Sequence, residues 1–175
     1  MKSALHDLAD QIAHETRDLT ADQLTWHPEG KWSIAEILEH LALTYSGTKL
    51  GLDRCLQAGK PSGRVPSAAD RVRAFVVTRL GYLPSGREAP RGTRPKGMPF
   101  DKIHQDLAAK ITLMEASISD SERRFGSKVR ILDHPFLGPF TASEWRKFHC
   151  AHGRHHLRQI RRLRKLIQAN RAANA

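Results

Sequence analysis

Apolar residues recur every three or four positions in four long segments of the 175-residue chain. This spacing matches the 3.6-residue turn of an α-helix, so it places the apolar side chains of each segment on one face. No alternating pattern extends far enough to predict a sheet. The sequence therefore predicts an all-α protein, a four-helix bundle that occupies residues 1–175 as a single domain.

Two of the predicted helices begin at a capping box, in which a hydroxyl and a carboxylate satisfy free amides of the first turn. One box starts at Ser33 and ends at Glu36, and the other starts at Thr141 and ends at Glu144. Long helices are expected over residues 2–18, 33–59, 101–119 and 141–170, with a short extra helix over 70–80 and a frayed tail over 169–175. The positions expected to face inward are Leu5, Leu8, Ile12 and Leu19; Ile34, Ile37, Leu38, Leu41, Tyr45, Leu52 and Leu56; Ile103, Leu107, Ile111 and Met114; and Trp145, Phe148, His152, His156, Ile160, Leu163 and Ile167.

The connections between these helices are rich in turn-forming residues. Residues 81–99 are dense in Gly, Pro, Arg and Lys, which predicts an exposed, irregular basic loop. Pro135 and Pro139 each disfavour helix in the preceding residue, so residues 133–140 are expected to form a loop. Trp26, Trp32 and Trp145 lie beside such loop entries and are interpreted as packing anchors.

The chain is strongly basic, with 29 Lys and Arg against 18 Asp and Glu and a net charge of +11. Such a charge attracts nucleic acid, anionic membranes and small acidic ligands alike. No nucleic-acid-binding motif accompanies it, and no apolar run approaches the roughly 20 residues that cross a bilayer. We therefore expect no specific nucleic-acid partner and no membrane insertion. The polar N-terminus and the separated Cys55 and Cys150 predict a cytoplasmic protein with free thiols.

The last predicted helix carries the residues with the clearest chemistry. His152 and His156 are four residues apart, so both imidazoles lie on one face and can approach one ion. A third ligand has to come from another helix, and His40 is the candidate because it lies beside Ile37 and Leu41. Three neutral imidazoles suit zinc, nickel or copper and leave one coordination position free. From the residues alone, solvated or hydrogen-bonded core histidines remain the alternative, and His149 and His155 are interpreted as groups at the surface or beside a ligand.

Three blocks of the sequence resemble a known family. Residues 26–41 (WHPEGKWSIAEILEHL) are similar to the first conserved block of the DinB-like (DinB/YfiT) superfamily, and residues 152–160 (HGRHHLRQI) are similar to its last. Residues 134–145 (HPFLGPFTASEW) resemble the DUF1569 branch of that superfamily. The order and separation of the blocks, which bracket most of the chain, make the resemblance fairly specific.

The resemblance implies a bundle of up-down-down-up topology, often a homodimer, with one zinc or nickel ion held by three histidines. These map onto His40, His152 and His156. Some members of the superfamily are S-transferases that use bacillithiol or mycothiol, some are thiol-dependent isomerases, and many have no known activity. No block of the superfamily matches the middle of this chain, so the resemblance does not indicate a substrate.

These observations together favour a metal-dependent enzyme, a thiol-dependent S-transferase or a hydrolase, acting on a small-molecule substrate. Arg154 and Arg158 are candidates to hold the carboxylates of a low-molecular-weight thiol, and Gln159 is a candidate to orient a ligand or bound water, or an ordinary rim residue. No general base is evident, because Glu36 belongs to a capping box and Glu39 is expected on the solvated face. Two alternatives stay open: a metal-binding bundle without catalysis, and a polyanion-binding protein that uses the basic residues between Arg158 and Lys165.

Overall fold

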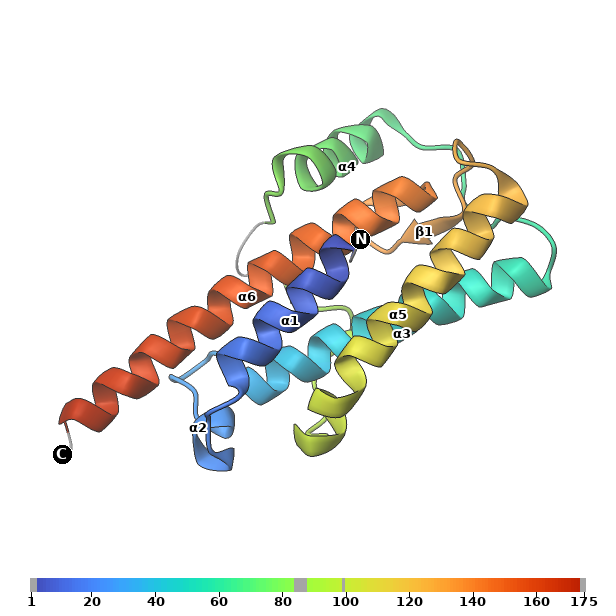
Figure 1. Cartoon of the computed structure of the whole chain (residues 1–175). Coiled ribbons are helices and arrows are strands. Elements are labelled where there is room, and N and C mark those ends of the chain that lie inside the picture. Colours follow the sequence, from blue (N-terminus) through green and yellow to red (C-terminus); the bar gives the residue numbers. More distant parts are fainter. Residues whose placement is uncertain (1–2, 84–87, 99, 174–175) are drawn as a thin grey trace.

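The computed structural model describes residues 3–83, 88–98 and 100–173, and it is mostly helical (Figure 1). The elements in chain order are α1 (Ala4–Thr16), α2 (Ala21–Thr25), α3 (Ile34–Gln57), α4 (Ala68–Leu80), a short 3-10 helix η1 (Arg91–Thr93), α5 (Phe100–Phe125), β1 (Leu132–His134), β2 (Gly138–Phe140) and α6 (Ala142–Ala173). In the described part of the chain, no helix has the length and apolar character that crossing a membrane requires.

The long helices α1, α3, α5 and α6 form the bundle, and α4 lies outside it against α6. In Figure 1, α1 and α6 lie side by side and run in one direction, whereas α3 and α5 pack together and run in the other. The predicted all-α bundle with up-down-down-up order is therefore confirmed. The expected short extra helix is α4, which begins two residues earlier than predicted.

The bundle core contains most of the apolar positions that the sequence singled out. In α3, the predicted core positions between Ile34 and Tyr45 are buried, and so are those of α6 between Trp145 and Ile167. Trp26 and Trp32 are partly buried and pack against this core. Leu19 and Leu56 are only partly buried, because α1 and α3 end before or beside them. The side chain of Ile103 lies outside the described residues.

Side-chain caps fix the starts of the helices. Ser33 Oγ accepts the Glu36 amide at 3.2 Å while the Glu36 carboxylate accepts the Ser33 amide at 2.8 Å, and Thr141 and Glu144 make the same exchange. Both predicted capping boxes are confirmed. A third box, in which Thr20 exchanges hydrogen bonds with Gln23, begins α2, a short helix that the sequence did not predict.

Other boundaries differ from the sequence prediction for local reasons. Helix α1 spans Ala4–Thr16, shorter than the predicted 2–18, because Ser3 caps its start. Helix α5 continues to Phe125, six residues beyond the predicted end, and stops before Gly126, whose positive φ of 100° ends the helix. Helix α6 continues to Ala173, so the predicted tail is helical up to that residue.

Residues 133–140 are not a plain loop. Strands β1 and β2 pair antiparallel, with Leu132 opposite Phe140 and His134 opposite Gly138. Pro139 is tolerated because this two-stranded ribbon leaves the edges of both strands free of further strands in the described structure. Gly138 is needed here, because its φ is +90° and a Cβ would lie 2.6 Å from Asp70 Cγ.

Helix α1 packs tightly against α6 at Gly153. A Cβ at this position would lie 2.2 Å from Leu8 Cδ2 and 3.1 Å from the Tyr45 hydroxyl. Both neighbours are buried, so neither side chain can move away without leaving its own packing. The close approach of α1 to α6 therefore requires a residue without a side chain between His152 and His156.

We predict that Gly153→Ala destabilises the protein although alanine is the better helix former. Overpacking against Leu8 should cost about 1–3 kcal/mol, which exceeds the roughly 1 kcal/mol of helix propensity gained. The free energy of unfolding from denaturant titration measures the effect. Gly47→Ala on α3, where a Cβ would meet nothing within 4 Å, is the control and should leave stability equal or higher. Equal gains in both variants would contradict the close contact.

Candidate metal centre

Three histidines from two helices converge inside the bundle. His40 lies in the second turn of α3, and His152 and His156 lie one turn apart in the middle of α6. His152 Nε2 is 3.1 Å from His40 Nε2 and 3.1 Å from His156 Nε2. All three side chains are buried, and they offer ligand atoms within 4.8 Å of one another, so this group could hold a metal ion.

The outer nitrogens of two of these rings have partners that fix the tautomer. His40 Nδ1 is 2.7 Å from the Thr93 carbonyl oxygen, which can only accept, so Nδ1 carries the proton. His156 Nδ1 is 2.8 Å from Gln159 Oε1, and the amide nitrogen of Gln159 faces His155 Nε2 at 3.1 Å. In the neutral rings, both Nε2 atoms therefore present lone pairs to His152.

This arrangement leaves too few protons between the three inner nitrogens. His152 Nε2 carries at most one proton, so it can donate to His40 or to His156 but not to both. One 3.1 Å contact would then bring two lone pairs together without a hydrogen atom. A cation bonded tetrahedrally to nitrogens at about 2.0–2.1 Å would space those nitrogens about 3.3–3.4 Å apart, close to the spacing here.

Burial keeps the three rings neutral. Desolvation lowers the pKa of His40, although the Thr93 carbonyl partly offsets the effect. Desolvation, together with the neighbouring imidazoles, lowers the pKa of His156 to about 3 and that of His152 well below its ordinary value. Only the neutral imidazole can donate a lone pair to a metal, so burial keeps the three rings in the form that a metal ion would require.

Aromatic side chains form part of the wall. The Phe148 ring stacks on His152 with centroids 5.3 Å apart and planes 13° apart, and Trp32 lies 5.1 Å from His40. These rings restrict rotation of the two imidazoles and keep water from their faces. Trp32 is thus both the packing anchor that the sequence predicted and a neighbour of the histidine group.

Residues 93–98 of the basic region are hydrogen-bonded to two consecutive residues of α3, Glu39 and His40. Thr93 accepts from His40, and the buried carboxylate of Glu39 accepts the backbone N–H groups of Lys96, Gly97 and Met98 at 2.8, 3.0 and 3.1 Å. The expectation that Glu39 faces solvent is wrong, because its side chain is 1% exposed. No sequence signal indicated that residues 96–98 fold back and donate their backbone N–H groups to Glu39.

Our interpretation of His149 as a surface group is also wrong. Its ring is fully buried between Tyr45, Trp145 and Phe148, and neither nitrogen has a hydrogen-bond partner among the described residues. Burial lowers its pKa to about 3, with a smaller contribution from His134. His155, by contrast, contacts Gln159, which in turn contacts His156. It therefore lies beside His156, which is one of the two positions that the sequence analysis allowed for it.

The remaining candidates lie on other faces of α6. Arg154 and Arg158 are exposed and each follows a triad histidine by two residues, which turns it about 200° around the helix. Their assignment to a thiol stays a prediction. Arg161 and Arg164 reach α1 instead: Arg161 pairs with Glu15 at 2.8 Å, and Arg164 donates to the Glu15 backbone carbonyl at 2.6 Å. Part of the basic helix end thus stabilises the bundle.

The bundle and its converging imidazoles define a class of helical protein in which facing helices could hold a metal ion in the core. A sequence model of the DinB superfamily matches residues 4–160, a span that includes His40, His152 and His156. The chain therefore belongs to the DinB superfamily. No curated protein and no solved structure matches it significantly. The DUF1569 branch stays a prediction from residues 134–145.

We predict that Glu39→Gln loosens the segment that Glu39 binds. Glutamine lacks the negative charge of Glu39, and its NH₂ group would face backbone N–H donors that it cannot accept from. The free energy of unfolding should therefore fall by about 2 kcal/mol. Trypsin should also cleave faster after Lys96. Glu29→Gln, which changes an exposed residue, is the control for charge. Unchanged stability and cleavage in Glu39→Gln would show that the three hydrogen bonds do not hold the segment.

We predict that His149→Phe makes the protein less sensitive to acid. The pKa of His149 is about 3 in the folded protein and near 6.5 in the unfolded chain. Above pH 6.5 the ring is neutral in both states and does not change the free energy of unfolding. Below that pH the unfolded chain binds a proton that the folded protein does not, so the fold is destabilised. Between about pH 6 and pH 4, the free energy of unfolding should fall less steeply in the variant than in the wild type. The difference between the two slopes should be roughly 1.4 kcal/mol per pH unit. Unfolding at several pH values measures this slope. The exposed His27→Gln is the control, and equal slopes in His149→Phe and wild type would contradict the assignment.

Proposed function

We propose that the chain binds one divalent transition metal, zinc or nickel, through the Nε2 atoms of His40, His152 and His156. The observation that supports this most is the 3.1 Å spacing of nitrogens, two of which are held as lone-pair donors by Thr93 and Gln159. Three imidazole ligands without a thiolate or carboxylate suit zinc and nickel, and three protein ligands leave a position for another molecule.

We further propose that the protein is an enzyme, a thiol-dependent S-transferase or a hydrolase acting on a small molecule. A bound metal of this kind lowers the pKa of a coordinated thiol or water and so makes a nucleophile near neutral pH. The chain's own residues would position the reactants: Thr93 and Gln159 orient the imidazoles, and Phe148 and Trp32 exclude water from them. The assignment of Arg154 and Arg158 to the carboxylates of a low-molecular-weight thiol stays a prediction from the sequence, and both residues leave α6 on a face turned about 200° from the histidines.

The carboxylates near His40 in the sequence favour a reaction that needs no protein general base. Glu36 is engaged by the Ser33 cap and Glu39 by three backbone amides, so both carboxylates already accept hydrogen bonds. Activation of a thiol fits this arrangement, because a bound metal would supply the activation that a protein base otherwise provides. The same observation supports the second candidate, a metal-binding bundle without catalysis. Cytoplasmic location and a homodimer belong to the proposal as expectations from the sequence.

Elemental analysis of purified protein tests the metal site. We expect about one zinc or nickel per chain in the wild type and less than about a tenth of that in His152→Ala/His156→Ala, because one remaining imidazole binds too weakly to retain the ion. His14→Ala/His27→Ala, which removes two histidines outside the triad, is the matched control and should keep its metal. Circular dichroism establishes that both variants are folded. Equal metal content in both would rule out the triad.

A conjugation assay with several biological thiols and a generic electrophile tests the reaction. The transferase predicts turnover that disappears on chelation and returns with zinc or nickel. Metal retention with no turnover by any thiol and no hydrolysis would favour the non-catalytic bundle. Turnover that is indifferent to chelation would contradict a metal-dependent mechanism.

A further inference from the structure

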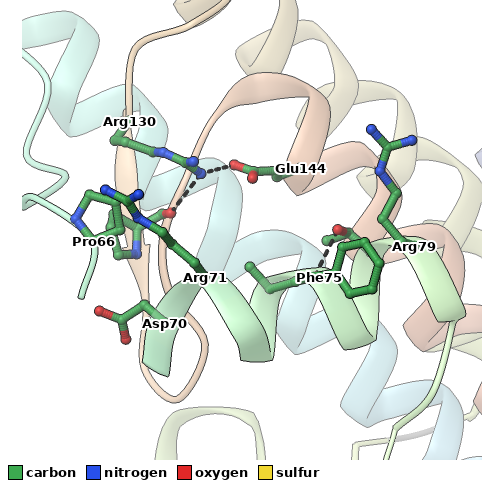
Figure 2. Close-up of a pocket in the computed structure, with 10 residues that line it drawn as sticks. Pro66, Asp70, Arg71, Phe75, Arg79, Arg130 and Glu144 are labelled. Atoms are coloured by element: carbon green, nitrogen blue, oxygen red, sulfur yellow. Dashed lines mark hydrogen bonds and ion pairs between the residues drawn. The ribbon is translucent and has the colours of Figure 1, made fainter. Parts of the chain in front are cut away.

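A cavity of about 190 Å³ lies between α4 and the start of α6 (Figure 2). Ala74, Phe75 and Thr78 of α4 line one side, and Arg130, Pro139 and Glu144 line the other. Glu144 precedes His152 by eight residues, which is about 12 Å along the helix. No triad histidine lines this cavity, so it is separate from the candidate metal centre.

The two carboxylates in the lining are already neutralised by other groups, and the first of them is Glu144. It pairs with Arg130 and accepts from the Thr141 amide and hydroxyl, and Figure 2 shows the Arg130–Glu144 pair on the side of the cavity opposite α4. The Arg130 guanidinium also donates to the Pro139 carbonyl at 3.2 Å. This pair forms a fixed polar wall with no net charge.

The second carboxylate, Asp70, is buried and accepts from four donors. Arg64 and Arg73 contact it at 2.5 and 2.8 Å, and the Ser67 amide and hydroxyl supply the other two hydrogen bonds at 2.9 and 2.8 Å. These donors hold the pKa of the Asp70 carboxyl well below its usual range. Asp70 therefore remains ionised but has no capacity left for the other arginines of the cavity.

Two cationic side chains in the lining are left over. The guanidinium groups of Arg71 and Arg79 have no hydrogen-bond or ion-pair partner within the described ranges, and the two residues lie two turns apart on α4. Phe75 lies midway between them and is 56% exposed, an unusual exposure for a phenylalanine. Figure 2 shows the two guanidinium groups at opposite ends of the lining, both outward from α4.

We propose that this cavity binds a small organic anion, a molecule with a carboxylate or phosphate group on an apolar or aromatic body. An unpaired guanidinium offers two parallel N–H donors that match either anion, and the exposed ring of Phe75 gives the body of the ligand an apolar surface. The Arg130–Glu144 pair lines the site on the side opposite α4. Arg71 and Arg79 each offer a guanidinium to the anionic group from one end of the lining. Phe75 favours a ligand that carries an apolar or aromatic part over an inorganic anion.

Titration of the full-length, metal-loaded protein with three probes tests the site. The probes are phenyl phosphate, which carries charge and ring, benzoate, which replaces phosphate by carboxylate, and inorganic phosphate, which lacks the ring. At about 150 mM salt we expect saturable binding of phenyl phosphate or benzoate with a Kd on the order of 1 mM or tighter, and binding of inorganic phosphate about tenfold weaker. The stronger of the two aromatic probes identifies the anionic group.

Variants separate this site from general electrostatic attraction. Arg71→Gln/Arg79→Gln should weaken the aromatic probe about tenfold or more, and Phe75→Ala should weaken it while leaving inorganic phosphate unchanged. Arg124→Gln/Arg162→Gln removes two exposed arginines elsewhere and should have no effect. Equal weakening in the two double variants would overturn the proposal.

Two further measurements distinguish this cavity from the histidine group and from a dimer interface. Binding should persist after chelation, and its loss would place the anion at the histidine group and overturn the proposal. Sedimentation of wild type and Phe75→Ala over a range of concentrations measures self-association through the exposed ring. A dimer that Phe75→Ala abolishes, with no probe binding to the wild type, would also overturn the proposal and assign this face to a second copy of the chain.

Discussion

In the interior of the bundle, the inner nitrogen of His152 lies 3.1 Å from that of His40 and 3.1 Å from that of His156, and it cannot donate to both. Buried polar atoms without partners are costly, and two lone pairs facing each other add repulsion to that cost. A bundle that only needed a packed core would place apolar side chains at these positions. A cation at the centre would remove this repulsion, and the contacts around the three rings fit the metal site that we propose.

The supports of the triad come from several parts of the chain. Thr93 orients His40 from a segment more than 50 residues away, and Glu39 binds the same segment through three amides. One turn of α3 therefore both carries His40 and fixes the loop that orients it. Gln159 orients His156 from the next turn of α6. Gly153, between the two histidines of α6, lets α1 pack directly against the helix that carries them.

The sequence predicted the parts of this arrangement that have local signatures. Helical spacing and the Ser33 and Thr141 boxes indicated the bundle and its helix starts, because caps and periodicity depend on neighbours in the sequence. The spacing of His152 and His156 indicated one face of the site. His40 needed the resemblance to a family, since nothing in its own helix distinguishes a ligand from a core histidine.

The features that the sequence did not predict depend on contacts between distant segments. Glu39 is a polar residue on a helix, and only the return of residues 96–98 makes it buried and satisfied. His149 is enclosed by aromatic rings that include Tyr45 of another helix. Likewise, the pairing of β1 with β2 around Pro139 requires a tertiary position for Gly138 beside Asp70. For Glu39 and His149, the local sequence pattern was compatible with an exposed side chain, and contacts with distant segments bury both.

X-ray absorption at the metal edge of the purified protein, dialysed free of thiols, tests the histidine triad most directly. We expect zinc or nickel with about three histidine nitrogens at roughly 2.0–2.1 Å and one further light ligand. Addition of a thiol should then introduce one sulfur at about 2.3 Å without loss of the nitrogens. Coordination by oxygen alone, or by cysteine sulfur before any thiol is added, would contradict a metal held by His40, His152 and His156.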